Sequence, residues 1–161
     1  NRIFSKATAQ NRAPEEARAA LALVRREAPG SAQHCHALRT LGRVLARRAP
    51  GTALGTLAEA RQLCAQVHGA RDIRLSLIAL ERALALLRQG SYAAVIETLA
   101  GHEARLAELG QEERLAALYT LRARAHQGRG DRGRAAADSA LATRWRAYAY
   151  GAEAGQAGVG G

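Results

Sequence analysis

The feature that most constrains this sequence is apolar residues at helical spacing, interrupted at intervals by Pro or Gly. Between the breaks, Leu and Ala recur every three or four residues, which predicts amphipathic helices joined by short turns. Pro is scarce, and aromatic residues make up only 4% of the chain, so helix propensity is high nearly throughout. The sequence therefore predicts an all-α chain of about seven helices in antiparallel pairs. The breaks fall at Pro29-Gly30, Pro50-Gly51, Gly69, Gly90, Gly110 and Gly130.

Local signals place the ends of these helices. We expect the first helix to begin at Pro14, because proline suits a first turn and the acids after it favour the helix N-terminus. One continuous helix is expected from Tyr92 to Leu109. Side chains capping helix N-termini are expected at Ser31, Thr52, Ser91 and Asp131, and the inward residues include Ala17, Ala20, Leu21 and Val24 in the first helix and Ala135, Ser139, Ala142 and Trp145 in the last.

The expected domain organisation is an N-terminal extension (1–13), a helical repeat domain (14–150) and a Gly-rich tail or linker (151–161). The sequence contains no Met, so we expect it to be a piece of a longer protein. No apolar run approaches the roughly 20 residues that would span a bilayer, so no membrane partner is expected. The expected location is the cytoplasm.

Two stretches of the chain align with an offset of 40 residues. Residues 82–106 and 122–146 each hold a helix that ends at Gly, a capping residue, and a second helix with small or apolar residues inward. The pairs include Gly90 over Gly130 and Leu99 over Ser139. A repeat of this length indicates stacked helix pairs that cover one another's apolar faces, although a nonrepeating bundle with the same helices remains an alternative.

The repeated pattern resembles the tetratricopeptide (TPR) repeat family, in its long-repeat form seen in bacterial regulators. The resemblance covers about residues 31–146. It implies a TPR-like α-solenoid that acts as a protein–protein interaction module or scaffold of a larger bacterial regulatory protein, with no cofactor. In the TPR family, the second helix of each repeat follows a Gly and a capping residue and has small or apolar residues inward. The residues that match this signature are Gly90, Tyr92, Val95, Ile96 and Leu99 in one copy and Gly130, Asp131, Ala135, Ala136 and Ala142 in the other.

The formal net charge of +10 is concentrated in the first half of the chain. Residues 1–80 carry 13 Lys and Arg against 5 Asp and Glu, whereas residues 81–161 carry 11 against 9. Arg39, Arg43 and Arg47 recur every four residues and so form a ridge along one helix, which Arg48 extends. No acid lies between Ala28 and Ala58.

Three interpretations of this ridge stay open: a solvated face, a groove for an acidic protein or peptide, and a nucleic-acid site. Proteins that bind single-stranded nucleic acid usually place aromatic residues among the basic ones, so that bases stack on them. No aromatic residue occurs between Phe4 and Tyr92, which counts against nucleic acid. We expect a protein or peptide partner, with nucleic acid as the alternative. The candidate partner-binding residues are Arg39, Arg43, Arg47, Arg48, Arg74 and Arg82.

The two cysteines lie in helices expected to form a hairpin, which brings Cys35 near Cys64. A disulfide and a metal cluster with the neighbouring histidines are both geometrically open. The spacing fits no standard zinc motif, so we expect two packed thiols and no metal site.

No catalytic site is expected, because the chain has no phosphate-binding loop, nucleophile elbow or His-Glu-x-x-His motif. Trp145, Tyr148 and Tyr150 gather at the end of the last helix and are expected to close one end of the array. The sequence assigns no oligomeric state.

Overall fold

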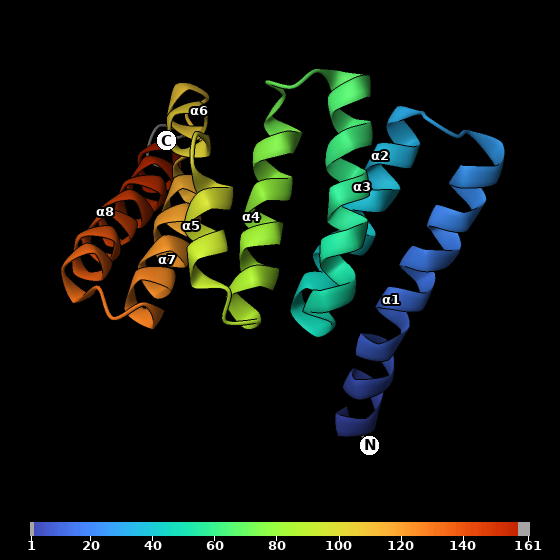
Figure 1. The fold of residues 1–161 in the computed structure, drawn as a ribbon, viewed down its shortest axis with the longest axis horizontal. Coiled ribbons are helices and arrows are strands. Elements are labelled where there is room, and N and C mark those ends of the chain that lie inside the picture. Colours follow the sequence, from blue (N-terminus) through green and yellow to red (C-terminus); the bar gives the residue numbers. More distant parts are fainter. Residues whose placement is uncertain (1, 158–161) are drawn as a thin grey trace. The chain divides into compact units, whose positions relative to one another are not determined.

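The computed structural model is all-α, as the sequence predicts. It describes the backbone of residues 2–157 and the side chains of residues 13–151. Within that part of the chain there are eight helices and no strand (Figure 1). The helices are α1 (Arg2–Glu27), α2 (Ala32–Arg48), α3 (Pro50–His68), α4 (Ile73–Arg88), α5 (Tyr92–Leu99), α6 (His102–Glu108), α7 (Glu112–Gly128) and α8 (Arg132–Ala157).

The chain divides into two compact units, Asn1–Ala85 and Leu86–Gly161. The first contains α1, α2, α3 and most of α4, and the second contains the remaining helices. The expected domain limits at residues 13/14 and 150/151 fall inside α1 and α8.

In the first unit, α2 and α3 form an antiparallel hairpin joined at Ala49. Ser31 caps α2 as predicted, because its hydroxyl oxygen accepts a hydrogen bond of 3.1 Å from the His34 N–H. The predicted cap at Thr52 is wrong, since α3 already begins at Pro50. Proline lacks the N–H that would be unpaired at the first helical position, so the helix starts there without a capping side chain.

The two helices of the hairpin approach closely at Gly42. A Cβ on Gly42 would overlap the Leu57 side chain, which is fully buried. Around this contact lies one apolar core, to which α1 adds Leu21 and α4 adds Ile78. The core therefore links all four helices of the first unit.

The expected start of the first helix at Pro14 is wrong, because Pro14 lies inside α1. Helix-forming residues precede the proline, so the helix continues on both sides despite the missing backbone hydrogen bond. Ala17 and Leu21 are buried as predicted, whereas Ala20 is exposed and Val24 is partly buried. Only a narrow stripe of α1 is therefore covered.

In the second unit, the single helix expected from Tyr92 to Leu109 is two helices, α5 and α6. Gly101 separates them with a backbone φ of 84°, a left-handed conformation that glycine adopts without strain. This break gives eight helices instead of seven. The predicted inward residues Val95 and Leu99 are buried.

Three turns of this unit share one hydrogen-bond pattern at a spacing of 20 residues. At Gly90, Gly110 and Gly130 the glycine has positive φ and its N–H donates to the carbonyl three residues earlier. The N–H of the following residue donates to the carbonyl five residues before it, which is the Schellman arrangement that ends a helix. The 40-residue offset in the sequence thus corresponds to every second turn of this series.

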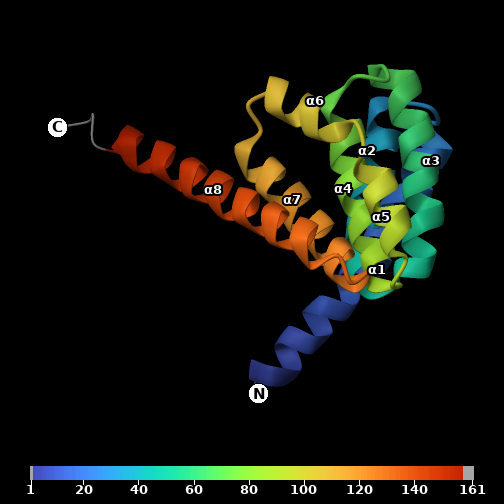
Figure 2. The ribbon, with the colours of Figure 1, turned by 60° about the vertical axis from the view of Figure 1, so that its left-hand side comes forward.

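Helix α8 packs along α7 and continues past its end (Figure 2). The predicted inward position of Ser139 is wrong: Ser139 is exposed, and Asp138 is buried in its place. Asp131 caps α8 as expected, its carboxylate accepting from the Arg134 N–H at 3.1 Å. Residues 151–157, expected to be a loose tail, continue the helix, and residues 158–161 of that tail lie outside the described residues.

A search of the described helices finds none long and apolar enough to cross a membrane.

Candidate functional site

The strongest candidate site is the arginine ridge, formed by Arg39, Arg43 and Arg47 on α2. Arg43 and Arg47 are exposed and Arg39 is partly buried. Arg47 Nη1 donates to the backbone oxygen of Arg43 at 3.0 Å, so the Arg47 side chain turns back along the helix toward Arg43. The structure thus places the three predicted arginines along one side of α2.

The carboxylate of Glu81 faces this ridge, and the sequence pattern did not reveal it. Arg47 Nη1 lies 3.1 Å from Oε2 of Glu81, which α4 supplies. Burial raises the pKa of Glu81, while the positive charges of Arg47, Arg43 and Arg39 act in the opposite direction. Three guanidinium groups therefore act on the partly buried Glu81.

The other three predicted binding residues have different surroundings. Arg48 is exposed at the end of α2. Arg74 donates to Asp72 at 3.0 Å, within its own turn of chain. Arg82 is partly buried, and both its burial and the nearby charge of Arg61 lower its pKa. Arg82 is thus placed beside an arginine of α3, whereas its neighbour Glu81 faces α2.

Asp72 also caps the start of α4. Burial raises its pKa, but hydrogen bonds from the backbone and side chain of Arg74 outweigh this effect, so the pKa lies below its usual value. The pair fixes the Arg74 side chain near the helix end.

The expectation of two packed thiols is wrong, because Cys35 and Cys64 form a disulfide. Their Cα atoms are 5.2 Å apart, and both residues are at most 1% exposed. They meet because residues equally far from the hairpin turn lie level on α2 and α3. Neither sulfur is then a thiolate for a metal, and no group of three or more metal-ligating side chains gathers among the described residues.

A second group of charges, which we call the Arg122 network, joins three helices of the second unit. Arg122 of α7 makes a two-pronged pair with Asp138 of α8, through Nε at 2.8 Å and Nη2 at 2.9 Å. Its Nη1 donates to Glu103 of α6 at 2.7 Å, and the hydroxyl of Tyr119 donates to the same carboxylate at 2.6 Å. His126 lies 3.8 Å from Asp138.

The Arg122 network shifts the titration of its members. The hydrogen bond from Tyr119 holds the pKa of Glu103 below its usual value, with Arg122 adding to the effect. Burial and the Glu103 carboxylate raise the pKa of Tyr119 to about 12. The hydrogen bond to Asp138 raises the pKa of Arg122. Arg122, Tyr119, Glu103 and Asp138 thus satisfy one another's hydrogen bonds across three helices, and this network stabilises the fold.

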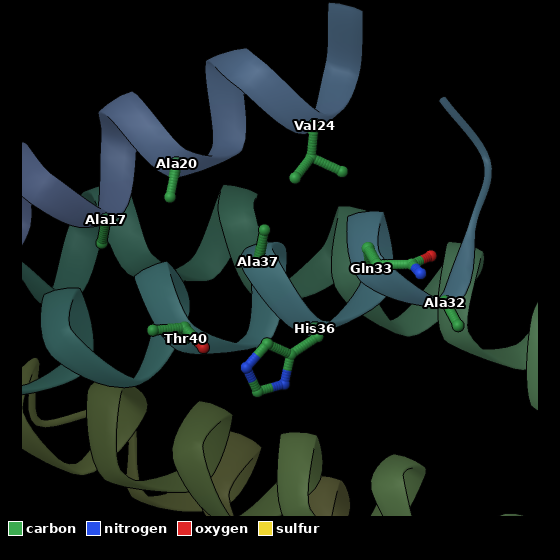
Figure 3. Close-up of a pocket in the computed structure, with 8 residues that line it drawn as sticks. All are labelled: Ala17, Ala20, Val24, Ala32, Gln33, His36, Ala37 and Thr40. Atoms are coloured by element: carbon green, nitrogen blue, oxygen red, sulfur yellow. The ribbon is translucent and has the colours of Figure 1, made fainter. Parts of the chain in front are cut away.

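An open apolar groove of about 470 Å³ lies between α1 and α2 (Figure 3). Its walls are mostly small side chains, and in the close-up Ala17, Ala20 and Val24 project from α1 toward α2. No sequence signal marked it, because it exists only where two helices meet over small residues. The lining residues are Ala17, Ala20, Val24, Ala32, Gln33, His36, Ala37 and Thr40.

The aromatic residues near the end of α8 are largely open to solvent. Tyr148 is 64% exposed and Tyr150 is 66% exposed, while Trp145 is partly buried and meets the Tyr148 ring edge-on at 6.0 Å. Within the described part of the chain, nothing covers the two tyrosines. The expected role of these residues in closing an array stays a prediction.

Comparison with known proteins gives no relative: no protein-family model, no curated protein and no solved structure matches the chain.

Proposed function

We propose that this chain is a protein–protein interaction module that binds an acidic segment of a partner along the arginine ridge. The observation that carries the proposal is the row of positive charge on α2, where Arg39, Arg43 and Arg47 all act on the Glu81 carboxylate. A surface with this excess of positive charge attracts negative side chains.

The position of Glu81 supports binding of further carboxylates. Arg47 is hydrogen-bonded to Glu81, and this acid is largely covered, with 21% of its side chain exposed. Guanidinium groups bind carboxylates through paired N–H donors, so Arg43 offers a ready contact for an incoming Asp or Glu.

The proposed class is a TPR-like α-solenoid in a larger bacterial regulatory protein, with a binding role instead of a catalytic one. The resemblance in sequence and the three equivalent turns at Gly90, Gly110 and Gly130 support this class. Helical repeats bind their partners on surface side chains, which suits a ridge that the packing of α2 leaves outward.

Charge reversal tests the proposal. The triple variant Arg39→Glu, Arg43→Glu, Arg47→Glu should lose its interaction partners in affinity purification from the source cells. The control variant Arg18→Glu, Arg26→Glu, Arg124→Glu makes the same change in net charge at exposed positions elsewhere, and should keep them. If the wild type and the ridge variant retained the same partners, the ridge would not be the binding surface.

A second candidate, a basic helical domain that binds nucleic acid, is favoured by the end of α8. There Tyr148 and Tyr150 are exposed within two to six residues of Arg144 and Arg146. Aromatic stacking beside arginine is a common way to hold single strands. This candidate predicts salt-sensitive binding to arbitrary oligonucleotides that Tyr148→Ala with Tyr150→Ala weakens; no binding at low salt would exclude it.

The proposed location is the cytoplasm, and the Cys35–Cys64 disulfide is the observation against it. Disulfides persist mainly in oxidising compartments. Acid quenching of the source cells, followed by unfolding of the protein in excess alkylating reagent and counting of the blocked cysteines, tests the location. The unfolding step is needed because both cysteines are buried in the folded protein. Two alkylated cysteines support the cytoplasm, and none places the chain in an oxidising compartment.

A further inference from the structure

The arginine ridge and the apolar groove lie side by side on α2. His36 and Thr40 line the groove. Because residues three, four and seven apart share a side of a helix, Arg43 and Arg47 continue the line of Thr40. Arg39 lies three residues after His36 on the same side. One wall of the groove thus has a basic rim.

The opposite wall of the groove, on α1, is apolar and open. Ala20 lines the groove and is exposed. Leu23, three residues further and so adjacent on the helix surface, is 45% exposed. Leu23 is a large aliphatic side chain that stays exposed beside the small Ala20. Such a surface is suited to contact with an apolar group of a partner.

The rim on α1 carries the opposite charge from the rim on α2. Glu16 lies four residues before Ala20, and Glu27 lies four residues after Leu23, so both share this side of α1. Both acids are exposed. The groove is therefore lined mostly by small residues and has glutamates along its α1 edge. The arginine ridge starts at its α2 edge with Arg39 and continues past its end to Arg43 and Arg47.

We propose that the groove between α1 and α2 binds an amphipathic helix of a partner protein, with its acidic flank on the arginine ridge. This inference rests on the proposed function and names the form of the acidic segment. The apolar edge of the partner helix fills the groove and covers Leu23. Its flank facing Glu16 and Glu27 carries basic or neutral residues, because acids there would be repelled.

The dimensions of the groove suit such a helix. Its walls run from Ala17 to Val24 on α1 and from Ala32 to Thr40 on α2. At 1.5 Å per residue, each wall is roughly 10–12 Å long, which matches about two turns of a partner helix. Two turns present apolar residues at positions i, i+4 and i+7, the anchors by which helices bind grooves.

Peptide selection followed by measured affinities tests the inference. A phage library of helical peptides, randomised at twelve positions, is selected on the wild-type chain. The enriched peptides should have apolar residues at i, i+4 and i+7 and Asp or Glu on one flank only. A fluorescent copy of the most enriched peptide is then titrated by anisotropy against each variant.

The variants separate the groove from the ridge. Ala20→Phe fills the groove from an exposed position and should weaken binding at least about tenfold. The control Ala19→Phe adds the same ring at the neighbouring exposed position, which does not line the groove, and should change affinity less than about twofold. Arg43→Glu with Arg47→Glu should also weaken binding at least about tenfold. Thermal unfolding of each variant verifies that it folds.

The possible outcomes are distinguishable. Peptides that bind Ala20→Phe as tightly as the wild type overturn the groove inference, and if ridge reversal still weakens them the proposed function stands. Enriched peptides without acids, or no enrichment at all, overturn both. A wild-type chain that dimerises in sedimentation, with dimerisation lost in Ala20→Phe, assigns the groove to a second copy and also overturns the inference.

Discussion

Two glycines in the α2–α3 hairpin have opposite steric surroundings, although both lie within helices. A Cβ at Gly42 would overlap Leu57, whereas nothing lies within contact distance of a Cβ at Gly55. Glycine is a poor helix former, so an alanine normally stabilises an exposed helical position by about 0.5–1 kcal/mol. The contact with Leu57 reverses this gain at Gly42.

Gly42→Ala should therefore destabilise the protein by about 1–3 kcal/mol, the usual cost of overpacking a core. Gly55→Ala should stabilise it by up to about 1 kcal/mol. Urea unfolding followed by circular dichroism measures both changes in free energy of unfolding. If the two variants changed stability in the same direction, the close approach at Gly42 would be wrong.

The Glu103 carboxylate should make the second unit sensitive to acid. Its folded pKa lies below the ordinary value of 4.5, because Tyr119 and Arg122 hydrogen-bond to the charged form. A lowered folded pKa gives stability that is fully present above pH 4.5 and is lost as the pH falls through the folded pKa.

Removing the phenol hydroxyl should shift this acid transition. In Tyr119→Phe the Glu103 carboxylate loses the hydrogen bond from the phenol and keeps the one from Arg122, so its folded pKa rises and the midpoint of acid unfolding moves to higher pH. Circular dichroism as a function of pH measures the midpoint, with Tyr148→Phe, an exposed tyrosine, as the control. An unchanged midpoint in Tyr119→Phe would contradict the role of this hydrogen bond.

At the scale of helices, the sequence predicts elements well where the signal is local. Ser31 and Asp131 cap their helices as expected, because a capping hydroxyl or carboxylate acts within three residues. Thr52 and Ser91 make no such cap. Near Thr52, the helix already begins at Pro50. Gly101 divides the helix expected from Tyr92 to Leu109, because its left-handed backbone conformation leaves no sign in the apolar spacing.

Contacts between helices were beyond the reach of the sequence pattern. Glu81 meets Arg47 across 34 residues, and Arg122 meets Asp138 across 16. Spacing along one helix shows which residues share a side, but not what the neighbouring helix places opposite them. The ridge was therefore predictable as a row of arginines, while its carboxylate and the adjoining groove were not.

The disulfide should be a major source of stability for the α2–α3 hairpin. It links Cys35 and Cys64, 29 residues apart, at the end of the hairpin opposite the Ala49 turn. A disulfide that closes a loop of this length lowers the entropy of the unfolded chain. In the chain-entropy model this adds roughly 3–4 kcal/mol to the free energy of unfolding. Reduction should lower the free energy of unfolding by about that amount.

Urea unfolding with and without a reductant measures this loss. In the double variant Cys35→Ala with Cys64→Ala, the reductant should leave the free energy of unfolding unchanged. This control separates loss of the disulfide from other effects of the reductant. Because both cysteines are buried, reduction of the folded wild type should be slow and should accelerate in partial denaturant. If the free energy of unfolding of the wild type were the same with and without reductant, the purified protein would lack the disulfide.

At the scale of the whole chain, each compact unit has its own source of stability besides its apolar core. The first unit, Asn1–Ala85, contains the disulfide, and the second, Leu86–Gly161, contains the Arg122 network. One responds to reductant and the other to acid, since a disulfide is insensitive to mild acid and a carboxylate is insensitive to reductant.

Hydrogen exchange resolved along the sequence should show these responses in separate segments. Acid near the folded pKa of Glu103 should speed exchange in α6, α7 and α8, after correction for the intrinsic effect of pH, because Glu103 and its partners lie there. Reductant at neutral pH should speed exchange in α2 and α3. If acid opened α2 and α3 as readily as α7 and α8, the Arg122 network would not be the acid-sensitive element. The Arg25–Glu59 pair is exposed and contributes little, and the pKa of Glu81 is raised by burial, so acid removes no stability at that group.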